Sequence, residues 1–419
     1  MSNDRIGAAI YLPPRVFGFF RSVFLSLAAN RARPDQPDED CFVLKAFPAL
    51  DCEFTLALNN RTGKYFFCKD MIDASQDLIR NCYYWRIPLK NLPPKTIARV
   101  LGRLARIEVD LRVRSYLPHI GLAPISHPRP MVFTDPRECV LYNLKSNDVV
   151  LCHDMGPITH PSLYEPGVRE LYTLAFDMIK AARPFMLFVS EASRRDFVTS
   201  CGSEFPLLQV VYPPIRSGME RSDEKAVPHI PSKFLLTVGS IGARKNQLRS
   251  IQAFDVSGLA KEGYAYVICG GPEPGAEQVI NLAQQTSGVV LPGYVDDDQL
   301  RWLYKNATGF VLPSLLEGFG LPAAEAINYG LVPLVGRGGA LQEVTGDAAV
   351  LVDPLDIANI AVGMTTLAGL SDEERNNRVT LLRHSVERFS LKSAVAAWRS
   401  ALILAAASQP NVRNPAGNT

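Results

Sequence analysis

Residues 234–239 are Phe-Leu-Leu-Thr-Val-Gly, and this run opens the series of short apolar segments that decides the fold. Five further runs of the same kind follow, at residues 266–269, 289–291, 310–312, 332–335 and 349–352. The segments between them have helical character over residues 247–254, 276–285, 298–306 and 322–328. Continuous apolar strands that alternate with helices predict a parallel sheet covered on both faces. Such sheets bind ligands at the carboxyl ends of their strands.

The chain divides into this regular second half and a less regular first half. At about 150 residues per domain, 419 residues correspond to two or three domains. Residues 213–232 carry four prolines and no apolar periodicity, which indicates a linker. We therefore expect an N-terminal domain over 1–212 and a second domain over 233–390. We expect 391–407 to form a helix that packs back on the N-terminal domain, and 408–419 to be a disordered tail.

Apolar runs in the first half predict strands at 42–44, 54–58 and 149–152, and periodic segments predict helices at 97–111 and 168–182. Residues 16–29 also have helical apolar spacing. We interpret this segment as a buried first helix, with a membrane-leaning helix as the alternative. Arg21 interrupts it, and no apolar run in the chain reaches the roughly 18 residues that a spanning helix needs.

The composition excludes several classes of protein. With 44 basic and 42 acidic residues the net charge is +2, which gives no bulk electrostatic reason to expect a nucleic-acid partner. Apolar residues make up 47% of the chain, too much for intrinsic disorder. The eight cysteines are scattered without zinc-ligand spacing, which is typical of reduced core residues in a cytoplasmic protein.

The strongest candidate site is the loop and helix start that follow the run at 310–312. Gly318 and Gly320 allow the backbone to approach a ligand, and Pro322 suits the first position of a helix. The N–H groups at that helix start are suited to a phosphate. Glu317 on the loop and Glu325 in the first helical turn suit the hydroxyls of a sugar and a ribose on either side of a diphosphate. Helix-dipole complementation by Glu325 is the structural alternative.

A second candidate is the segment 239–246, Gly-Ser-Ile-Gly-Ala-Arg-Lys-Asn, between the first run and its helix. Arg244 and Lys245 at a helix start oppose the helix dipole, so an anion between them is expected, and a diphosphate would supply it. A solvated loop is the alternative. The chain contains neither a Walker loop nor a Gly-x-Gly-x-x-Gly fingerprint.

Two further motifs contain polar groups at predicted strand ends. His153 follows the strand 149–152 and could donate to a sugar hydroxyl or a phosphate, or could be satisfied by Asp154 or a backbone group. The run 296–298, Asp-Asp-Asp, precedes a helix, and we interpret it as a helix cap rather than a metal site.

Taken together, these residues resemble the retaining glycosyltransferases of family four, which have the GT-B architecture of two Rossmann-like, doubly wound parallel-sheet domains facing a central cleft. The resemblance covers about residues 148–356. The family's pair of glutamates, with seven residues between them, falls on Glu317 and Glu325, and its His-Asp element falls on His153 and Asp154. Its Val-Ser-Glu-x-Ser strand end corresponds to residues 189–193, and Gly338, Gly339 and Glu343 resemble its next glycine loop.

The resemblance implies an α/β enzyme that transfers a hexose from a nucleotide-diphosphate sugar with retention of configuration and without a bound metal or other cofactor. It implies a catalytic group formed by Glu317, Arg244, Lys245 and His153. It implies donor-binding residues Glu325, Gly318, Phe319, Gly320, Leu321, Gly239 and Ser240. On the acceptor side we expect Asp154 and Gly18, the latter because family members begin with a strand and a glycine-rich loop and Gly18 is the only glycine in the corresponding segment.

The partners implied are a nucleotide sugar, with GDP-mannose as the first guess, and a saccharide or polyprenyl-linked saccharide acceptor in surface or secreted glycan synthesis. We expect a cytoplasmic protein with peripheral contact at the inner face of the membrane, and no nucleic acid. Two enzymatic alternatives keep the architecture, a nucleotide-sugar epimerase and a phosphorylase. An alternative of a different class is a catalytically silent binding subunit of a polysaccharide complex. The Glu317 to Glu325 string disfavours the epimerase, and the intact charged residues disfavour the silent subunit.

Overall fold

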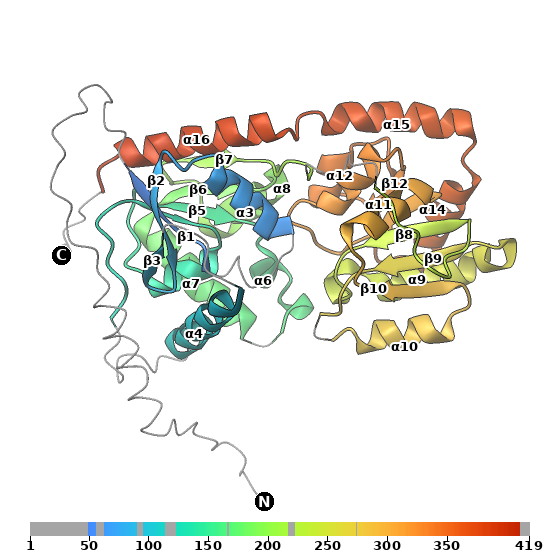
Figure 1. Cartoon of the computed structure of the whole chain (residues 1–419), viewed down its shortest axis with the longest axis horizontal. Coiled ribbons are helices and arrows are strands. Elements are labelled where there is room, and N and C mark those ends of the chain that lie inside the picture. Colours follow the sequence, from blue (N-terminus) through green and yellow to red (C-terminus); the bar gives the residue numbers. More distant parts are fainter. Residues whose placement is uncertain are drawn as a thin grey trace, which may run out of the picture. The chain divides into compact units, whose positions relative to one another are not determined.

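The computed structural model describes residues 49–55, 63–89, 95–113, 123–165, 167–216, 223–273 and 275–410. Several predicted features lie outside these residues: the helix at 16–29, Gly18, the strand at 42–44, part of the linker and the tail beyond residue 410. The described chain contains two sheets, and we call each sheet with its helices a lobe (Figure 1).

The N-terminal lobe has a seven-stranded sheet in the order β3-β2-β1-β4-β5-β6-β7. Its strands are β1 Leu50–Glu53, β2 Ile79–Tyr84, β3 Ile87–Leu89, β4 Met131–Phe133, β5 Val149–Cys152, β6 Phe185–Phe188 and β7 Leu208–Val210. All neighbouring strands pair in parallel except β2 and β3, which form a hairpin. The strands β1, β4, β5 and β6 are buried along their whole length, as parallel strands covered on both faces require.

The helices of this lobe are α3 Gly63–Asp73, α4 Lys95–Val113, α6 Gly156–Thr159, α7 Val168–Ala182 and α8 Glu191–Cys201. The predicted helix at 168–182 and strand at 149–152 are confirmed with these bounds. The predicted strand at 54–58 is wrong where the structure describes it, because the strand lies at Leu50–Glu53 and ends before Phe54. The apolar run there misled the prediction: β1 contains the charged residues Asp51 and Glu53, both buried.

The C-terminal lobe has a six-stranded, wholly parallel sheet in the order β10-β9-β8-β11-β12-β13. Its strands are β8 Phe234–Val238, β9 Ala265–Cys269, β10 Val289–Gly293, β11 Gly309–Leu312, β12 Pro333–Gly336 and β13 Val350–Val352. Its helices are α9 Gln247–Ser257, α10 Glu277–Gln285, α11 Asp297–Asn306, α12 Leu321–Asn328, α13 Gly339–Thr345, α14 Ile357–Gly369 and α15 Asp372–Val386. This order reverses between β8 and β11, so a crevice for ligand opens at their carboxyl ends.

The predicted fold class is confirmed: two doubly wound parallel-sheet lobes of Rossmann type. In the N-terminal lobe the strand that occupies the place of a first Rossmann strand is β1, and the connection that follows it leads to Gly63 at the start of α3.

The last helix, α16 Leu391–Ala407, packs on the N-terminal lobe (Figure 1). The Trp398 ring is fully buried and lies edge-on to Phe67 of α3, with ring centroids 6.4 Å apart. Within the described residues one segment, Asp372–Ala407, is long and apolar enough by length and composition to cross a membrane, which the sequence reading did not anticipate. It contains α15 and α16, and the apolar side chains Trp398 and Leu402 are used in packing within the fold.

Candidate active site

The site is built on the two strands between which the sheet order reverses, β8 and β11. After β8 the chain passes Gly239 and Ser240 and forms a short 3-10 turn over Ala243–Lys245. After β11 it passes Ser314 and Glu317 and enters α12. The two connections meet, since the Leu315 N–H donates to the carbonyl oxygen of Arg244 over 2.9 Å.

The Glu317 carboxylate lies between the two predicted cations. Its Oε1 is 2.5 Å from Lys245 Nζ, and its Oε2 is 3.1 Å from Arg244 Nη1. The Ser314 hydroxyl also donates to Oε1, over 2.9 Å. The sequence predicted an anion between Arg244 and Lys245, and in the structure that anion is Glu317 itself. Both cations are therefore paired with the same carboxylate.

Electrostatics keep this group ionised. Burial alone would raise the pKa of Glu317, but the charges of Lys245 and Arg244 and the hydrogen bonds from Lys245 and Ser314 lower it below its ordinary value. Burial would lower the pKa of Arg244, but the Glu317 and Asp154 charges raise it. At neutral pH the site therefore contains a carboxylate and two cations fixed in position, the kind of preorganised charge that stabilises a departing anion.

Gly239 and Ser240 line the same crevice. A Cβ on Gly239, which has a φ of 144°, would lie 3.6 Å from Lys245 Nζ, so glycine here leaves room beside the ammonium group. The Ser240 hydroxyl donates to Glu273 Oε1 over 2.6 Å. Glu273 also borders a cavity of about 450 Å³, together with Ser162, Tyr164 and Arg244.

Sequence reasoning gave no role to Asn246, which holds the two connections together. Asn246 has the left-handed φ of 61°, which asparagine tolerates better than most residues. Its buried Nδ2 donates to the carbonyl oxygens of Pro313 and Pro354, over 3.0 and 2.6 Å. A lone asparagine before a helix gives no sequence signal that separates this role from ordinary capping.

The Gly-Phe-Gly loop is held by close approaches on both sides. A Cβ on Gly318 would lie 2.2 Å from the carbonyl oxygen of His153, and a Cβ on Gly320 would lie 2.5 Å from Leu341 of α13. Leu321 meets the start of α3, since a Cβ on Gly63 would lie 2.7 Å from Leu321 Cδ1. Only glycine fits at 318 and 320 without movement of their neighbours.

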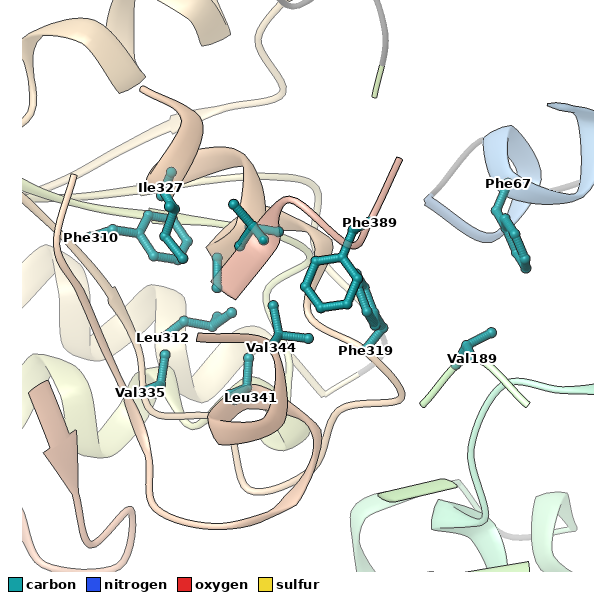
Figure 2. Packing of buried hydrophobic residues seen from close by; sticks show 14 of the residues in the cluster. Phe67, Val189, Phe310, Leu312, Phe319, Ile327, Val335, Leu341, Val344 and Phe389 are labelled. Atoms are coloured by element: carbon teal, nitrogen blue, oxygen red, sulfur yellow. The ribbon is translucent and has the colours of Figure 1, made fainter. Parts of the chain in front are cut away.

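The Phe319 side chain is an anchor rather than a ligand-facing group. It is 5% exposed and packs edge-on against Phe389, with ring centroids 4.9 Å apart (Figure 2). Tyr212 completes this aromatic cluster, 5.1 Å from Phe389 and 6.2 Å from Phe319. The cluster attaches residues 317–321, which we call the donor loop, to the two segments by which the chain passes between the lobes, near residues 212 and 389.

Glu325 lies deeper than the sequence indicated. The helix α12 begins at Leu321, so Pro322 is its second residue rather than its first, and Glu325 is outside the first turn. Complementation of the helix dipole therefore does not explain this glutamate. The Tyr304 hydroxyl donates to Glu325 Oε2 over 3.0 Å. Burial raises the pKa of Glu325 to about 7, against the lowering effects of Arg216 and Tyr304.

His153 lies at the carboxyl end of β5, and its backbone contacts the donor loop through Gly318. Its Nε2 is 2.9 Å from the carbonyl oxygen of Thr134, so Nε2 carries the hydrogen and Nδ1 is the acceptor. Burial, followed by the charge of Lys64, lowers the pKa of His153 to about 4, and the ring is neutral at pH 7. The backbone-satisfied alternative thus describes Nε2, while Nδ1 could accept a hydrogen from a sugar hydroxyl.

Asp154, the other predicted acceptor-side residue, is tied into its own loop. Its Oδ1 accepts from the Gly156 N–H over 3.0 Å and from the Tyr164 hydroxyl over 3.3 Å. Lys64 Nζ lies 3.8 Å from Oδ2. Sequence reasoning missed Lys64 and Tyr164, because neither belongs to a motif and only the fold brings them to this strand end.

Within the described residues no group of three or more His, Cys, Asp or Glu side chains is arranged to hold a metal ion. The helix-cap interpretation of 296–298 is confirmed: the Asp296 carboxylate accepts from the Gln299 N–H and the Gln299 side chain returns a bond in a capping box.

Comparison with solved structures supports this description of the fold. The fold is similar to that of WaaG, described as a glycosyltransferase involved in lipopolysaccharide biosynthesis, with a TM-score of 0.58 at 15% identity over 86% of this chain and 100% of that chain. It is also similar to the trehalose-6-phosphate synthase OtsA, with a TM-score of 0.56 at 12% identity over 85% of this chain and 84% of that chain. The architecture is therefore GT-B.

Residues 220–380 match the family model of glycosyl transferases group 1. The chain is 27% identical over 233 residues to a serotype-specific mannosyltransferase WbdA of Escherichia coli, covering 51% of this chain and 28% of that protein. It is 28% identical over 240 residues to the O-antigen chain mannosyltransferase B of Escherichia coli, covering 54% of this chain and 61% of that protein. The matched region thus spans less than a third of the WbdA protein.

Proposed function

We propose that this chain is a retaining hexosyltransferase that moves a sugar, with mannose as the first candidate, from a nucleotide-diphosphate donor to a saccharide acceptor in surface glycan synthesis. The observation that carries the proposal is the Arg244–Glu317–Lys245 arrangement at the point where the sheet order reverses. Its two cations, the buried Lys245 and the partly exposed Arg244, are held in place by one carboxylate and are suited to a leaving diphosphate. The mannosyltransferase relatives support mannose.

In the proposed reaction the bond from the anomeric carbon of the sugar to the diphosphate oxygen breaks, and a bond from that carbon to an acceptor hydroxyl oxygen forms on the same face. The hydroxyl proton passes to the departing diphosphate. Arg244, Lys245 and the N–H groups of Phe319, Gly320 and Leu321 would bind the diphosphate, and Gly239 and Ser240 would border it. Glu317 would hold the transferred sugar and Glu325 the ribose, and no step requires a bound metal or another cofactor.

On the acceptor side we assign Nδ1 of His153 as a hydrogen-bond acceptor for a sugar hydroxyl, with Asp154 shaping the adjacent loop. The acceptor would be a saccharide, either free or attached to a polyprenyl lipid. A cytoplasmic setting with peripheral membrane contact would suit such an acceptor, and the described cysteines are all free. We also retain the domain limits 1–212, 233–390 and 391–407 as part of this proposal.

The test is thermal unfolding of the full chain with GDP, UDP and ADP, followed by transfer assays with the corresponding sugar nucleotides. A ligand at about 100 times its dissociation constant adds roughly 2.7 kcal/mol of stability. We expect a raised midpoint with one base and transfer with its sugar conjugate, with the anomeric configuration of the product read by NMR. No midpoint shift and no transfer with any donor would instead favour a silent subunit. Epimerisation of the free donor would favour the epimerase.

A further inference from the structure

The first turn of α8, residues 191–193, lies in the N-terminal lobe and forms hydrogen bonds with the C-terminal lobe. The function proposed above assigns no role to these hydrogen bonds. The helix begins after Ser190, whose side chain accepts from the Ser193 N–H over 3.0 Å. Ser190 and Ser193 are both buried. This turn directly follows β6 and adjoins the strand end that carries His153.

Glu343 of α13, in the C-terminal lobe, binds the backbone at this turn. Its Oε1 accepts from the Glu191 N–H over 2.7 Å and its Oε2 accepts from the Ala192 N–H over 2.8 Å. The N–H groups of a first helical turn have no partner within the helix and carry partial positive charge, so a carboxylate is favoured there. This carboxylate comes from the opposite lobe, 152 positions along the chain from Glu191.

Ser193 joins the same two lobes one residue further along. Its hydroxyl oxygen lies 3.1 Å from the carbonyl oxygen of His153 and 3.3 Å from the carbonyl oxygen of Gly318, so its single hydrogen is directed between them. The His153 carbonyl belongs to the loop on the sugar-acceptor side, and the Gly318 carbonyl belongs to the donor loop. The Gly318 backbone is close to that His153 carbonyl, since a Cβ on Gly318 would lie 2.2 Å from the His153 carbonyl oxygen.

Tyr212 of the aromatic cluster interacts with the same carboxylate. Burial, together with the charge of Glu343 and a hydrogen bond to it, raises the pKa of Tyr212 to about 12. Tyr212 in turn packs on Phe319 and Phe389 in the aromatic cluster. Glu343 therefore contacts both the first turn of α8 and a hinge residue that packs on the donor loop.

From these contacts we propose that Glu343 and Ser193 are positioning residues, which set the distance between the His153 loop and the donor loop at residues 317–321. This inference rests on the proposed transfer reaction, because that distance matters only if an acceptor at His153 must meet a sugar held by Glu317. Neither residue would touch substrate. Misplacement by about 1 Å of groups that hold reactants costs about a hundredfold in rate.

The test uses Glu343→Gln and Ser193→Ala in the full chain, with Glu277→Gln as the matched control. Glu277 lies on a helix of the C-terminal lobe, as Glu343 does, but is exposed. We expect each test variant to lower the turnover number for transfer by about a hundredfold at saturating donor. The Kd for the nucleoside diphosphate should be unchanged, because its binding groups all lie in the C-terminal lobe. Glu343→Asp, which keeps the charge, should recover part of the turnover.

Hydrogen exchange of the peptide containing Glu191 and Ala192 gives a readout that needs no activity. The exchange of these two amides should accelerate in Glu343→Gln and remain at the wild-type rate in Glu277→Gln. Unchanged exchange, or unchanged turnover in Glu343→Gln, would overturn the inference, as would a rise in nucleotide Kd that accounts for the lost turnover. A wild-type chain inactive with every donor would contradict the proposed function, and the exchange result would then decide the contact role of Glu343 alone.

Discussion

Lys245 Nζ lies 2.5 Å from Glu317 Oε1, although 72 positions separate the two residues in the chain. Both side chains are nearly inaccessible, at 8% and 7% exposure. The pair joins the ends of β8 and β11, and its consequences for ligand binding can be measured because Arg244 contacts the same carboxylate.

Replacing Glu317 by glutamine should affect binding and transfer in opposite directions. The amide keeps the volume of the side chain but removes the negative charge that offsets Lys245 and Arg244. We expect a nucleoside diphosphate to bind about tenfold more tightly, corresponding to ~1.4 kcal/mol, while sugar transfer is lost. Titration calorimetry with the diphosphate that shifts the thermal midpoint measures this. Weaker binding would show instead that the carboxylate organises the cations for the ligand.

Glu325→Gln should change how stability depends on pH. The pKa of Glu325 is raised from 4.5 to about 7 in the folded chain, so its stabilising contribution is complete below pH 4.5 and is lost as pH rises through 7. The glutamine variant lacks this loss. Between pH 4.5 and 8 its free energy of unfolding should therefore rise relative to that of the wild type by up to about 3 kcal/mol. Urea unfolding at both pH values measures the gain.

Glu53, whose pKa burial also raises to about 7, is present in both chains and cancels in this comparison. A difference in unfolding free energy that is the same at pH 4.5 and pH 8 would contradict the raised pKa of Glu325.

His153 should remain neutral throughout the ordinary working range. Because its folded pKa is lowered from 6.5 to about 4, its ring resonances should not shift between pH 5.5 and 8. The unfolded chain binds the proton more readily, so His153 makes the fold less stable as pH falls from 6.5 towards 4. NMR of the imidazole ring protons, assigned with His153→Asn, tests this. A midpoint near 6.5 would mean that the ring is accessible to water.

Phe319→Ala should destabilise the fold and weaken nucleotide binding together. Truncation of a buried phenylalanine costs about 3–5 kcal/mol, and here it also frees the donor loop from Tyr212 and Phe389. Phe319→Leu keeps much of the packing and should lose less in both measurements. Urea unfolding and calorimetry on the two variants are compared. Full nucleotide affinity in a destabilised Phe319→Ala chain would show that the packing of Phe319 does not affect nucleotide binding at the donor loop.

The sequence predicted the C-terminal lobe well because its parallel strands are buried on both faces and therefore read as unbroken apolar runs. The run at 310–312 is an example: the strand is Gly309–Leu312. The first lobe was harder, because β1 carries the buried charges Asp51 and Glu53 and the more apolar residues next to it lie outside the strand.

At the site, motif spacing identified Glu317, Glu325, Arg244 and Lys245 as candidates, and the structure brings Glu317 together with both cations. Motif spacing could not predict that Glu317 would be the partner of both cations, since spacing along the chain does not fix distances between loops. The same limit applies to Glu343, whose partners are backbone N–H groups that leave no trace in side-chain pattern.

The chain passes between the lobes twice, near residues 212–216 and again near 389, and the two passages are bonded to each other, since the Ile215 N–H donates to the carbonyl oxygen of Phe389 over 3.2 Å. Two chain crossings that are bonded to each other act as a hinge: they permit rotation of the lobes about the line that joins the crossings, and they resist twisting and sliding. Because α16 returns to the N-terminal lobe and is anchored there by Trp398, the crossing near residue 389 is attached to both lobes. Removal of α16 would leave the lobes joined by a single tether, free to swivel.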